Sequence, residues 1–330
     1  MKELLTRLTQ HEKLSRQEAK EALLFIGRGE GNHYQVTTFL SIYMMRNISV
    51  SELAGFRDAL IELCIAVDLS AYNPIDLCGT GGDSKDTFNI STLSSFVTAG
   101  AGIPVAKHGN YGVSSSCGSS NVMEYLGVKF SNDSAFLERC IDQAGICVLH
   151  APLFHPAMKH VAPIRRALQL KTFFNMLGPL VNPCSPKRQM VGVFNLALLR
   201  LYALLFQETE TQYCIVHALD GYDEISLTSG TKAISNKGET IIYPSTFGLT
   251  ALSPSAIGGG HSIEAAAIFT NVLNNEATTA QKQVVCANAG TAIATALDIS
   301  LAEGYAKAQE SIESKKALAA FKKLLELSKA

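Results

Sequence analysis

Apolar side chains in the first seventy residues recur at intervals of three and four positions, the spacing of the buried face of an α-helix. Two segments begin with the serine–glutamate pair of a capping box, Ser15 with Glu18 and Ser49 with Glu52. No alternation of apolar and polar residues, which would indicate a strand, interrupts them. The sequence predicts a small all-helical N-terminal domain over residues 1–70, with one helical face made by Val36, Phe39, Leu40 and Tyr43.

From residue 71 onward the pattern changes to short apolar segments separated by glycine turns and helical stretches. Alternating strands and helices are typical of a parallel sheet with helices on both faces. We therefore expect a larger α/β domain over residues 71–330 with a mainly parallel central sheet. The expected strands are Ile75–Leu77, Pro104–Ala106, Ile146–Leu149, Met190–Val193, Gln212–Val216 and Thr240–Tyr243. The expected helices begin near Ser91, Ser120, Ser134, Ala197, Ser262 and Thr278, and a last one fills the C-terminus.

One stretch in the middle of the chain, residues 155–186, is rich in proline and carries helical patterns without strand signals. Such a segment either crosses over within the α/β domain or returns to the N-terminal helices. The residues alone leave both possibilities open.

Composition narrows the class of protein. Of the 330 residues 47% are apolar and 17% charged, which suits a packed globular enzyme and excludes a disordered chain. The formal net charge of −1 argues against binding to nucleic acid. Eight cysteines without a C-x-x-C pair indicate reduced thiols, so we expect a cytoplasmic protein. No stretch approaches the ~20 apolar residues of a membrane span, and the N-terminus lacks the pattern of a signal peptide.

The glycine-rich segment Gly79–Asp83 follows the first expected strand and precedes Asn89–Thr92, where a helix begins. Glycines let backbone N–H groups approach an anion closely, and a helix N-terminus adds a positive dipole end. A tight strand-to-helix turn is the alternative, and the adjoining polar residues favour anion binding. The spacing fits neither a Walker loop nor a dinucleotide fingerprint.

A second polar cluster, Lys107–Asn110 with Ser114–Ser116 and Gly118–Asn121, follows the next expected strand. Loops after successive parallel strands converge at one edge of the sheet, so this cluster is expected beside the glycine loop. Lys107 would meet a phosphate as a point charge, and serine hydroxyls would donate to its oxygens. A solvated serine loop is the plainer alternative.

Acidic residues follow a later expected strand, at Asp220–Glu224. Adjacent carboxylates suit Mg²⁺, which takes one or two carboxylates together with phosphate oxygens and waters. By itself the segment is more typical of an Asp-Gly turn with solvated acids, and the two candidate phosphate loops are what favour the metal. Arg165 is a further candidate, because a guanidinium binds a carboxylate through two hydrogen bonds, although a surface arginine is the commoner outcome.

Together these segments resemble the anthranilate phosphoribosyltransferase family of tryptophan biosynthesis, from the helical N-terminus to the C-terminal helix. The resemblance rests on Gly79–Asp83, Thr87–Thr92, Lys107–Asn110 with Ser114–Ser119, His155–Lys159, Arg165, Phe174–Leu180 with Asn182-Pro183, and Asp220–Thr228. It implies transfer of phosphoribose from 5-phosphoribosyl 1-pyrophosphate (PRPP) to the amine of anthranilate. It also implies a homodimer formed through the helical domain. Residues of about 165–186 would belong to that helical domain together with residues 1–70.

The resemblance assigns roles to individual residues. PRPP would be bound by Gly79, Gly82, Asp83, Thr87, Asn89, Ile90, Ser91, Thr92, Lys107, His108, Gly109, Asn110, Ser114, Ser115 and Ser119. Anthranilate would be bound by Gly79, Asn110, Arg165, His108, His155 and Pro179. Mg²⁺ would be bound by Ser91, Asp223 and Glu224. No residue is assigned as an acid, base or nucleophile.

The chain departs from the family pattern at a few positions. Tyr111-Gly112 stands where the family commonly has arginine after the Lys-His-Gly-Asn run, and Ser120-Asn121 stands where Ala-Asp is usual. Two other functions compete: a pyrimidine nucleoside phosphorylase-like enzyme, and a non-catalytic relative that binds nucleic acid. The near-neutral charge and the presence of Asn110 and Arg165 argue against the second.

Overall fold

The computed structural model describes residues 1–112 and 116–329. The chain divides into two compact units. The helical unit consists of Met1–Val67 and Ala151–Pro183, and the α/β unit consists of Asp68–His150 and Cys184 onward. The sequence placed the segment that joins the N-terminal helices at about 165–186, whereas the segment in the structure begins at Ala151.

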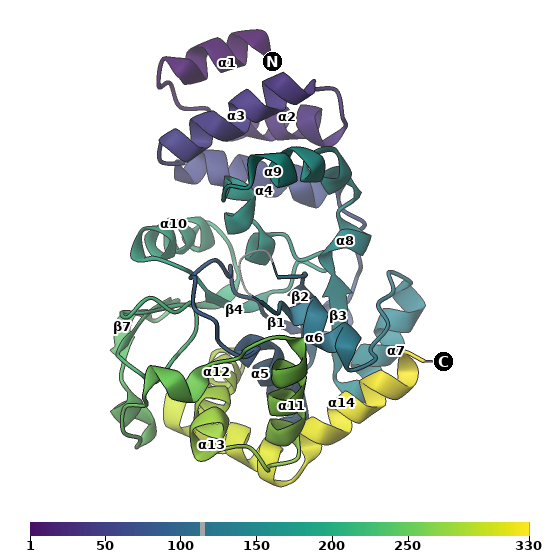
Figure 1. The fold of residues 1–330 in the computed structure, drawn as a ribbon, viewed down its shortest axis with the longest axis vertical. Helices are drawn as coiled ribbons and strands as arrows, with labels where there is room; N and C mark the ends of the chain where they lie inside the picture. The colour runs from purple at the N-terminus through teal and green to yellow at the C-terminus, as the bar shows by residue number, and fades with distance from the viewer. Residues whose placement is uncertain (113–115, 330) are drawn as a thin grey trace. The chain divides into compact units, whose positions relative to one another are not determined.

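The helical unit contains helices only, as the sequence predicts for residues 1–70 (Figure 1). Ser15 and Ser49 both form the expected capping boxes. The first helix was not predicted. The elements are α1 (Lys2–Thr9), α2 (Arg16–Gly27), α3 (His33–Met45), α4 (Val50–Leu63), α8 (Ala151–Phe154), η2 (Pro156–His160), α9 (Ala162–Leu168), η3 (Phe173–Met176) and η4 (Gly178–Leu180).

Aromatic rings from distant parts of the sequence form the core of this unit. Phe56 of α4 stacks on Phe173 of η3, with ring centroids 4.5 Å apart. Phe39 of α3 meets both rings edge-on. Helices α2 and α4 cross closely at Gly55, where a Cβ would lie 2.2 Å from the Arg16 carbonyl oxygen. The second chain segment therefore completes the core of the N-terminal helices.

The α/β unit alternates strands and helices, which confirms the predicted fold class. Its strands are β1 (Ile75–Leu77), β2 (Val105–Gly109), β3 (Ile146–His150), β4 (Arg188–Gly192), β5 (Gln212–Ala218), β6 (Thr231–Ser235) and β7 (Gly238–Ile242). Its helices are η1 (Ser70–Tyr72), α5 (Ile90–Gly100), α6 (Ser119–Tyr125), α7 (Ser134–Ala144), α10 (Leu196–Gln207), η5 (Pro244–Phe247), η6 (Pro254–Ile257), α11 (Ser262–Leu273), α12 (Thr279–Leu297), α13 (Leu301–Glu313) and α14 (Lys316–Leu327).

The strands form one sheet in the order β3-β2-β1-β4-β5-β6-β7. The first five strands in this order pair in parallel, and β5, β6 and β7 pair antiparallel. β6 was missed by the sequence analysis, and the last strand begins at Gly238 rather than at the expected Thr240. β1 lies where the strand order reverses, the position at which open α/β sheets bind ligands.

Helices cover both faces of this sheet. Tyr213 of β5 stacks on Phe206 of α10, whereas the next residue, Cys214, faces Thr295 of α12. Since successive strand residues point to opposite faces, α10 and α12 cover opposite sides. Among residues 1–112 and 116–329, no single helix has the length and apolarity of a membrane span. The pair α12 and α13 reaches that length and apolarity when taken together, but the two helices are bent by 118° at their junction.

Candidate active site

The carboxyl ends of the parallel strands carry the predicted polar motifs. β1 leads into Gly79–Asp83, β2 carries the lysine of the second cluster, and β5 leads to the turn that holds Asp223 and Glu224. The structure joins the glycine loop to this acidic turn. Gly81 N–H donates to Asp223 Oδ2 at 2.7 Å, and Ser91 N–H at the start of α5 donates to Glu224 Oε1 at 3.2 Å. This geometry belongs to α/β enzymes that bind ligands at the carboxyl edge of the sheet.

Close packing against Asp223 explains two of the glycines. A Cβ on Gly79 would lie 2.8 Å from Asp223 Oδ2, and a Cβ on Gly192 would lie 1.6 Å from the Asp223 carbonyl oxygen. Gly81 and Gly82 have φ of +59° and +79°, the left-handed region that favours glycine. Sequence reasoning missed Gly192, since nothing near it in the chain shows that Asp223 approaches.

The two carboxylates lie in an electrostatic environment that disfavours their charged forms. Burial raises the pKa of Asp223, and the nearby Asp83 carboxylate raises it further. Burial also raises the pKa of Glu224 well above its ordinary value, with Asp223 the next cause. Lys107 offsets part of this, and no ion pair to either carboxylate exists within residues 1–112 and 116–329. A cation at this position would favour both ionised carboxylates.

The oxygen ligands fit magnesium. Ser91, Glu224 and Gly79 border a cavity of about 10 Å³, room for one water-sized atom. Across the described part of the chain, no group of three or more His, Cys, Asp or Glu side chains could hold a metal by itself. Mg²⁺ needs no such group, because it combines one or two carboxylates with phosphate oxygens and waters.

The start of α5 and the glycine loop present polar groups that lack partners. Asn89 Oδ1, Thr92 Oγ1 and Thr80 Oγ1 are buried and form no hydrogen bond within the described residues. Leaving such an atom unpaired costs about 1–3 kcal/mol, so these groups point to a polar ligand. Ile90 is buried and anchors the first turn of the helix.

Lys107 lies deeper than the sequence suggested. It is 3% exposed, and its Nζ donates to the Leu77 carbonyl oxygen at 2.6 Å, on the side of the carboxylates. The next residue, His108, is also buried, and its N–H donates to Asp76 Oδ1 at 3.1 Å. Asp76 was not among the predicted site residues, although it fixes the backbone of this segment. Ser114 and Ser115 lie outside the described residues.

The loop after β2 is closed at its base by Asn121, a member of the second polar cluster to which no individual role was assigned. Asn121 Oδ1 accepts from Gly112 N–H at 2.9 Å and from Gly118 N–H at 3.0 Å. The two glycines are so close that a Cβ on Gly118 would lie 2.1 Å from Gly112 N. The Asn110 carbonyl accepts from both Ser119 Oγ and Ser120 N–H, each at 3.1 Å. A Cβ on Gly109 would meet Ser119 Oγ at 2.5 Å.

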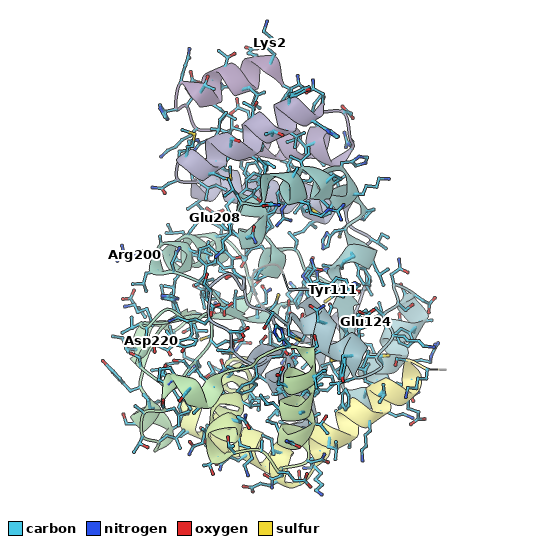
Figure 2. All side chains as sticks on the ribbon, viewed as in Figure 1. Lys2, Tyr111, Glu124, Arg200, Glu208 and Asp220 are labelled. Carbon is cyan, nitrogen blue, oxygen red and sulfur yellow. The ribbon has the colours of Figure 1, made fainter. Side chains whose placement is uncertain are left out.

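Tyr111, which replaces the family's usual arginine, joins an aromatic group beside this loop. Its ring meets the ring of His150 edge-on at 4.9 Å, and His150 stacks on Phe130 at 4.5 Å. Its hydroxyl donates to Glu124 Oε1 at 3.4 Å, and Figure 2 labels both residues. The position therefore supplies packing in place of a positive charge.

A run of glycines that sequence reasoning overlooked, Gly258–Gly260, supports the segment before α5. Thr87 forms an isolated antiparallel bridge with Gly258, and Gly259 N–H donates to the Asp86 carbonyl at 2.7 Å. A Cβ on Gly259 would lie 2.4 Å from the Thr87 carbonyl oxygen. Three consecutive glycines before a helix were the available signal.

The remaining predicted residues, Arg165, His155 and Pro179, belong to the helical unit. Arg165 of α9 lies over the Phe174 ring at 5.3 Å, and its Nη2 donates to Asn175 Oδ1 at 3.3 Å. No carboxylate within the described residues pairs with it. Burial lowers the pKa of His155 to about 4, so its ring is neutral near pH 7. Pro179 is buried in η4.

Comparisons with known proteins agree with this architecture. The helical bundle domain of the glycosyl transferase family matches residues 2–64, and the a/b domain of the same family matches residues 71–318. The anthranilate phosphoribosyltransferase of Christiangramia forsetii is 63% identical, covering 99% of both chains. That of Bacteroides thetaiotaomicron is 52% identical, again over 99% of both.

Solved structures give the same result. The anthranilate phosphoribosyltransferase of Thermus thermophilus superposes with a TM-score of 0.93 at 31% identity over 99% of both chains. The Saccharomyces cerevisiae enzyme in complex with PRPP and Mg superposes with a TM-score of 0.92 at 26% identity, covering 98% of this chain and 96% of that one. The chain belongs to the glycosyl transferase family and, within it, to the anthranilate phosphoribosyltransferases.

Proposed function

We propose that the chain transfers the phosphoribosyl group of PRPP to the amine of anthranilate and releases pyrophosphate, a step of tryptophan biosynthesis. The names of its relatives state this activity for them. In this chain the proposal rests on one observation above all: the glycine loop and α5 donate backbone N–H groups to Asp223 and Glu224. The loop proposed to bind the anion and the two acids proposed to bind the metal thus meet at one edge of the sheet.

PRPP lies, in this proposal, along the loops after β1 and β2. Gly79, Gly82, Asp83 and the first turn of α5 bind its pyrophosphate, since the unpartnered Asn89 and Thr92 oxygens lie there. Thr87, Ile90, Ser91, Lys107, His108, Gly109, Asn110 and Ser119, with Ser114 and Ser115, complete the predicted set. Lys107 lies close enough to Glu224 to act on its pKa, so in this proposal its charge acts on the metal-binding side of the site.

Mg²⁺ would be held by Ser91, Asp223 and Glu224 together with pyrophosphate oxygens. When bound, it stabilises the negative charge that develops on the leaving pyrophosphate. The N–H groups of Gly81 and Ser91 hold the two carboxylates in place. Their burial raises the pKa of both and so disfavours the charged forms until a cation binds. The S. cerevisiae structure with PRPP and Mg supports this choice of ion.

Anthranilate would be bound by Arg165 through its carboxylate, with Gly79, Asn110, His108, His155 and Pro179 as further contacts. A guanidinium that stacks on Phe174 and lacks a carboxylate partner within the described chain suits an aromatic acid. The amine of anthranilate is already a nucleophile, so the chain needs to orient it toward C1 of the ribose rather than deprotonate it strongly.

A fluorescence assay tests the proposed reaction. The purified chain, PRPP and Mg²⁺ should consume anthranilate, and omitting PRPP or adding a chelator should stop the loss. A parallel reaction with thymidine and phosphate tests the nucleoside phosphorylase alternative, and activity there without anthranilate consumption would overturn the proposal. Arg165→Ala should raise the KM for anthranilate about 10–100-fold, the value of a charged hydrogen bond. The exposed neighbour provides the control, Arg166→Ala, with an unchanged KM.

We further propose a cytoplasmic homodimer formed through the helical unit. The eight cysteines are all free thiols, which suits a reducing compartment. Tyr34 and Met45 near the two ends of α3 are 86% and 87% exposed, and large apolar side chains on one helix favour a protein contact. Light scattering should give the mass of a dimer for the native chain and of a monomer for Met45→Lys. A native monomer would contradict the proposal.

A further inference from the structure

A second cavity lies within the α/β unit, between the antiparallel strands β5–β7 and the junction of α12 with α13. Its volume is about 350 Å³, within the range of small-molecule sites. Its lining shares no residue with the carboxylate loop or the glycine loop. The cavity is therefore a separate feature of the unit.

Small side chains on both walls create this space. In the sheet, directly paired residues share a face, and the pairs Cys214 with Ser235 and Ala233 with Thr240 line the cavity. On α12 the lining residues Thr291, Ala294 and Thr295 recur at helical spacing and form one face. A sheet–helix interface that served only stability would be filled by larger apolar side chains.

Three charged residues line the cavity, Lys237, Asp298 and Glu239. Glu239 pairs with Lys232, and the other two are in contact with each other. Lys237 Nζ, in the turn between β6 and β7, lies 2.6 Å from Asp298 Oδ1, at the C-terminal end of α12. Their side chains are 66% and 69% exposed. The apolar residues Ile242, Ile299 and Leu301 also border the cavity. The lining thus combines an exposed pair of opposite charges with buried small and apolar side chains such as Ala233, Ala294 and Ile242.

We propose that this cavity is a regulatory site for a zwitterionic amino acid with a large apolar side chain. The ammonium and carboxylate of the ligand exchange partners with Asp298 and Lys237, and the side chain occupies the interior. No bond forms or breaks. The regulatory half of the proposal rests on the proposed function, because α12 connects the cavity to the acidic turn. Asn288 lies one turn before Thr291 on α12. Its Oδ1 accepts from the N–H of Ile225 at 3.0 Å and its Nδ2 donates to the Ile225 carbonyl at 2.9 Å, and Ile225 directly follows Glu224.

Thermal unfolding of the full chain, without substrates, tests binding. L-tryptophan, L-phenylalanine and L-leucine are probes with side chains of decreasing size. At least one should raise the midpoint by about 2–4 °C at roughly ten times its Kd. Tryptamine and indole-3-propionate, which each carry one of the two charges, should give no shift at the same concentration. No shift with any of the three amino acids would overturn the proposal.

Variants locate the site. Ala294→Phe fills the cavity and should abolish the shift, while Ala319→Phe, on the exposed face of α14, should keep it. Lys237→Gln and Asp298→Asn change only exposed rim groups and should each weaken binding about tenfold, which keeps the test valid if Ala294→Phe does not fold. An unchanged affinity in both rim variants would overturn the assignment.

The regulatory half has its own measurement. The amino acid should shift the midpoint of the Mg²⁺ titration of activity in the native enzyme and in Ala319→Phe, but not in Ala294→Phe. If the amino acid binds but leaves the midpoint of the Mg²⁺ titration unchanged, the regulatory half of the proposal is wrong, and the cavity is a ligand site without an effect on activity. Because binding is measured without PRPP or anthranilate, failure of the proposed reaction would be recognised separately.

Discussion

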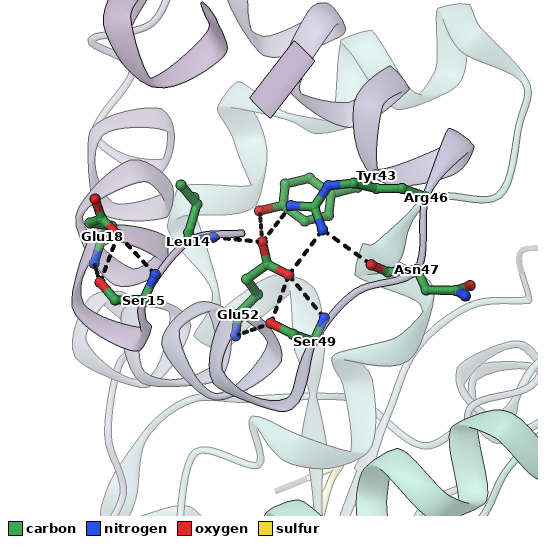
Figure 3. A network of polar contacts seen from close by, with 8 residues as sticks. All are labelled: Leu14, Ser15, Glu18, Tyr43, Arg46, Asn47, Ser49 and Glu52. Carbon is green, nitrogen blue, oxygen red and sulfur yellow. Dashed lines mark hydrogen bonds and ion pairs between the residues drawn. The ribbon is translucent and has the colours of Figure 1, made fainter. Parts of the chain in front are cut away.

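Each of the two units contains a buried carboxylate, Glu52 in the helical unit and Asp223 in the α/β unit, and the surroundings of the two differ in kind. In the helical unit Glu52 accepts from Leu14 N–H at 3.0 Å, Ser49 N–H at 2.9 Å and Tyr43 Oη at 2.9 Å, and it pairs with Arg46 (Figure 3). Burial acts to raise its pKa, but Arg46 and these donors outweigh it and bring the pKa to about 2.

In the α/β unit the balance is reversed, because Asp223 and Glu224 have raised pKa values and no ion pair within the described chain. The comparison separates two uses of a buried acid. Glu52 finds all its partners in the chain and contributes to stability. The acidic turn is completed only by something that the chain does not supply, which is the property expected of a ligand site.

The largest expected effect is at the acidic turn. Asp223→Asn keeps an acceptor for Gly81 N–H but removes a charge that the proposed metal requires. We expect kcat to fall on the order of 10³-fold, about 4 kcal/mol, with the midpoint of unfolding unchanged or higher, because a disfavoured charge is lost. Steady-state kinetics over a Mg²⁺ titration check this. Asp142→Asn, an exposed position on α7, is the control, and equal losses in both variants would contradict the comparison.

In the helical unit the same kind of change should act on stability. Glu52→Ala leaves the partly buried Arg46 without its partner, and we expect a loss of about 3 kcal/mol in the free energy of unfolding. Glu18 offers a matched control, because it forms the equivalent capping box with Ser15 (Figure 3). It also pairs with Arg7 at the surface. Glu18→Ala should cost about 1 kcal/mol or less. Urea unfolding measures both, and equal losses would show that burial of Glu52 is unimportant.

The pH dependence of this stability has a defined sign. The pKa of Glu52 is about 2 in the folded protein, below the ~4.3 of an unperturbed glutamate. Its contribution is therefore fully present above pH ~4.3 and is lost as the pH falls toward 2. The difference in unfolding free energy between the native chain and Glu52→Ala should narrow between pH 6 and pH 3. A difference that stays constant over this range would contradict the lowered pKa.

Features that depend on neighbouring residues were predicted from the sequence, and features that depend on tertiary approach were not. The Ser15 and Ser49 capping boxes and the glycine loop could be recognised in the sequence, because the residues that define each of them lie within a few positions of one another. β6 was missed because Thr231–Ser235 mixes polar and apolar residues and is stabilised by pairing with β5. Gly192 was missed because its need for a small residue comes from Asp223, far away in the sequence.

Asn121 lies close to the proposed ligand site, and its side-chain oxygen, like the carboxylate of Glu52, finds its partners within the chain. Substituting it tests whether the α/β unit also uses such internal contacts for structure. Asn121→Ala removes the oxygen that joins Gly112 to Gly118, a loss of two hydrogen bonds of about 0.5–1.5 kcal/mol each. The loop that carries proposed PRPP contacts then lacks its closure, and the KM for PRPP should rise about tenfold with little change in kcat. Asn121→Asp keeps an acceptor oxygen and should behave like the native chain. If aspartate and alanine raised the KM for PRPP equally, the acceptor oxygen of Asn121 would not be what supports PRPP binding. If neither raised it, the loop would keep its conformation without the two hydrogen bonds to Asn121.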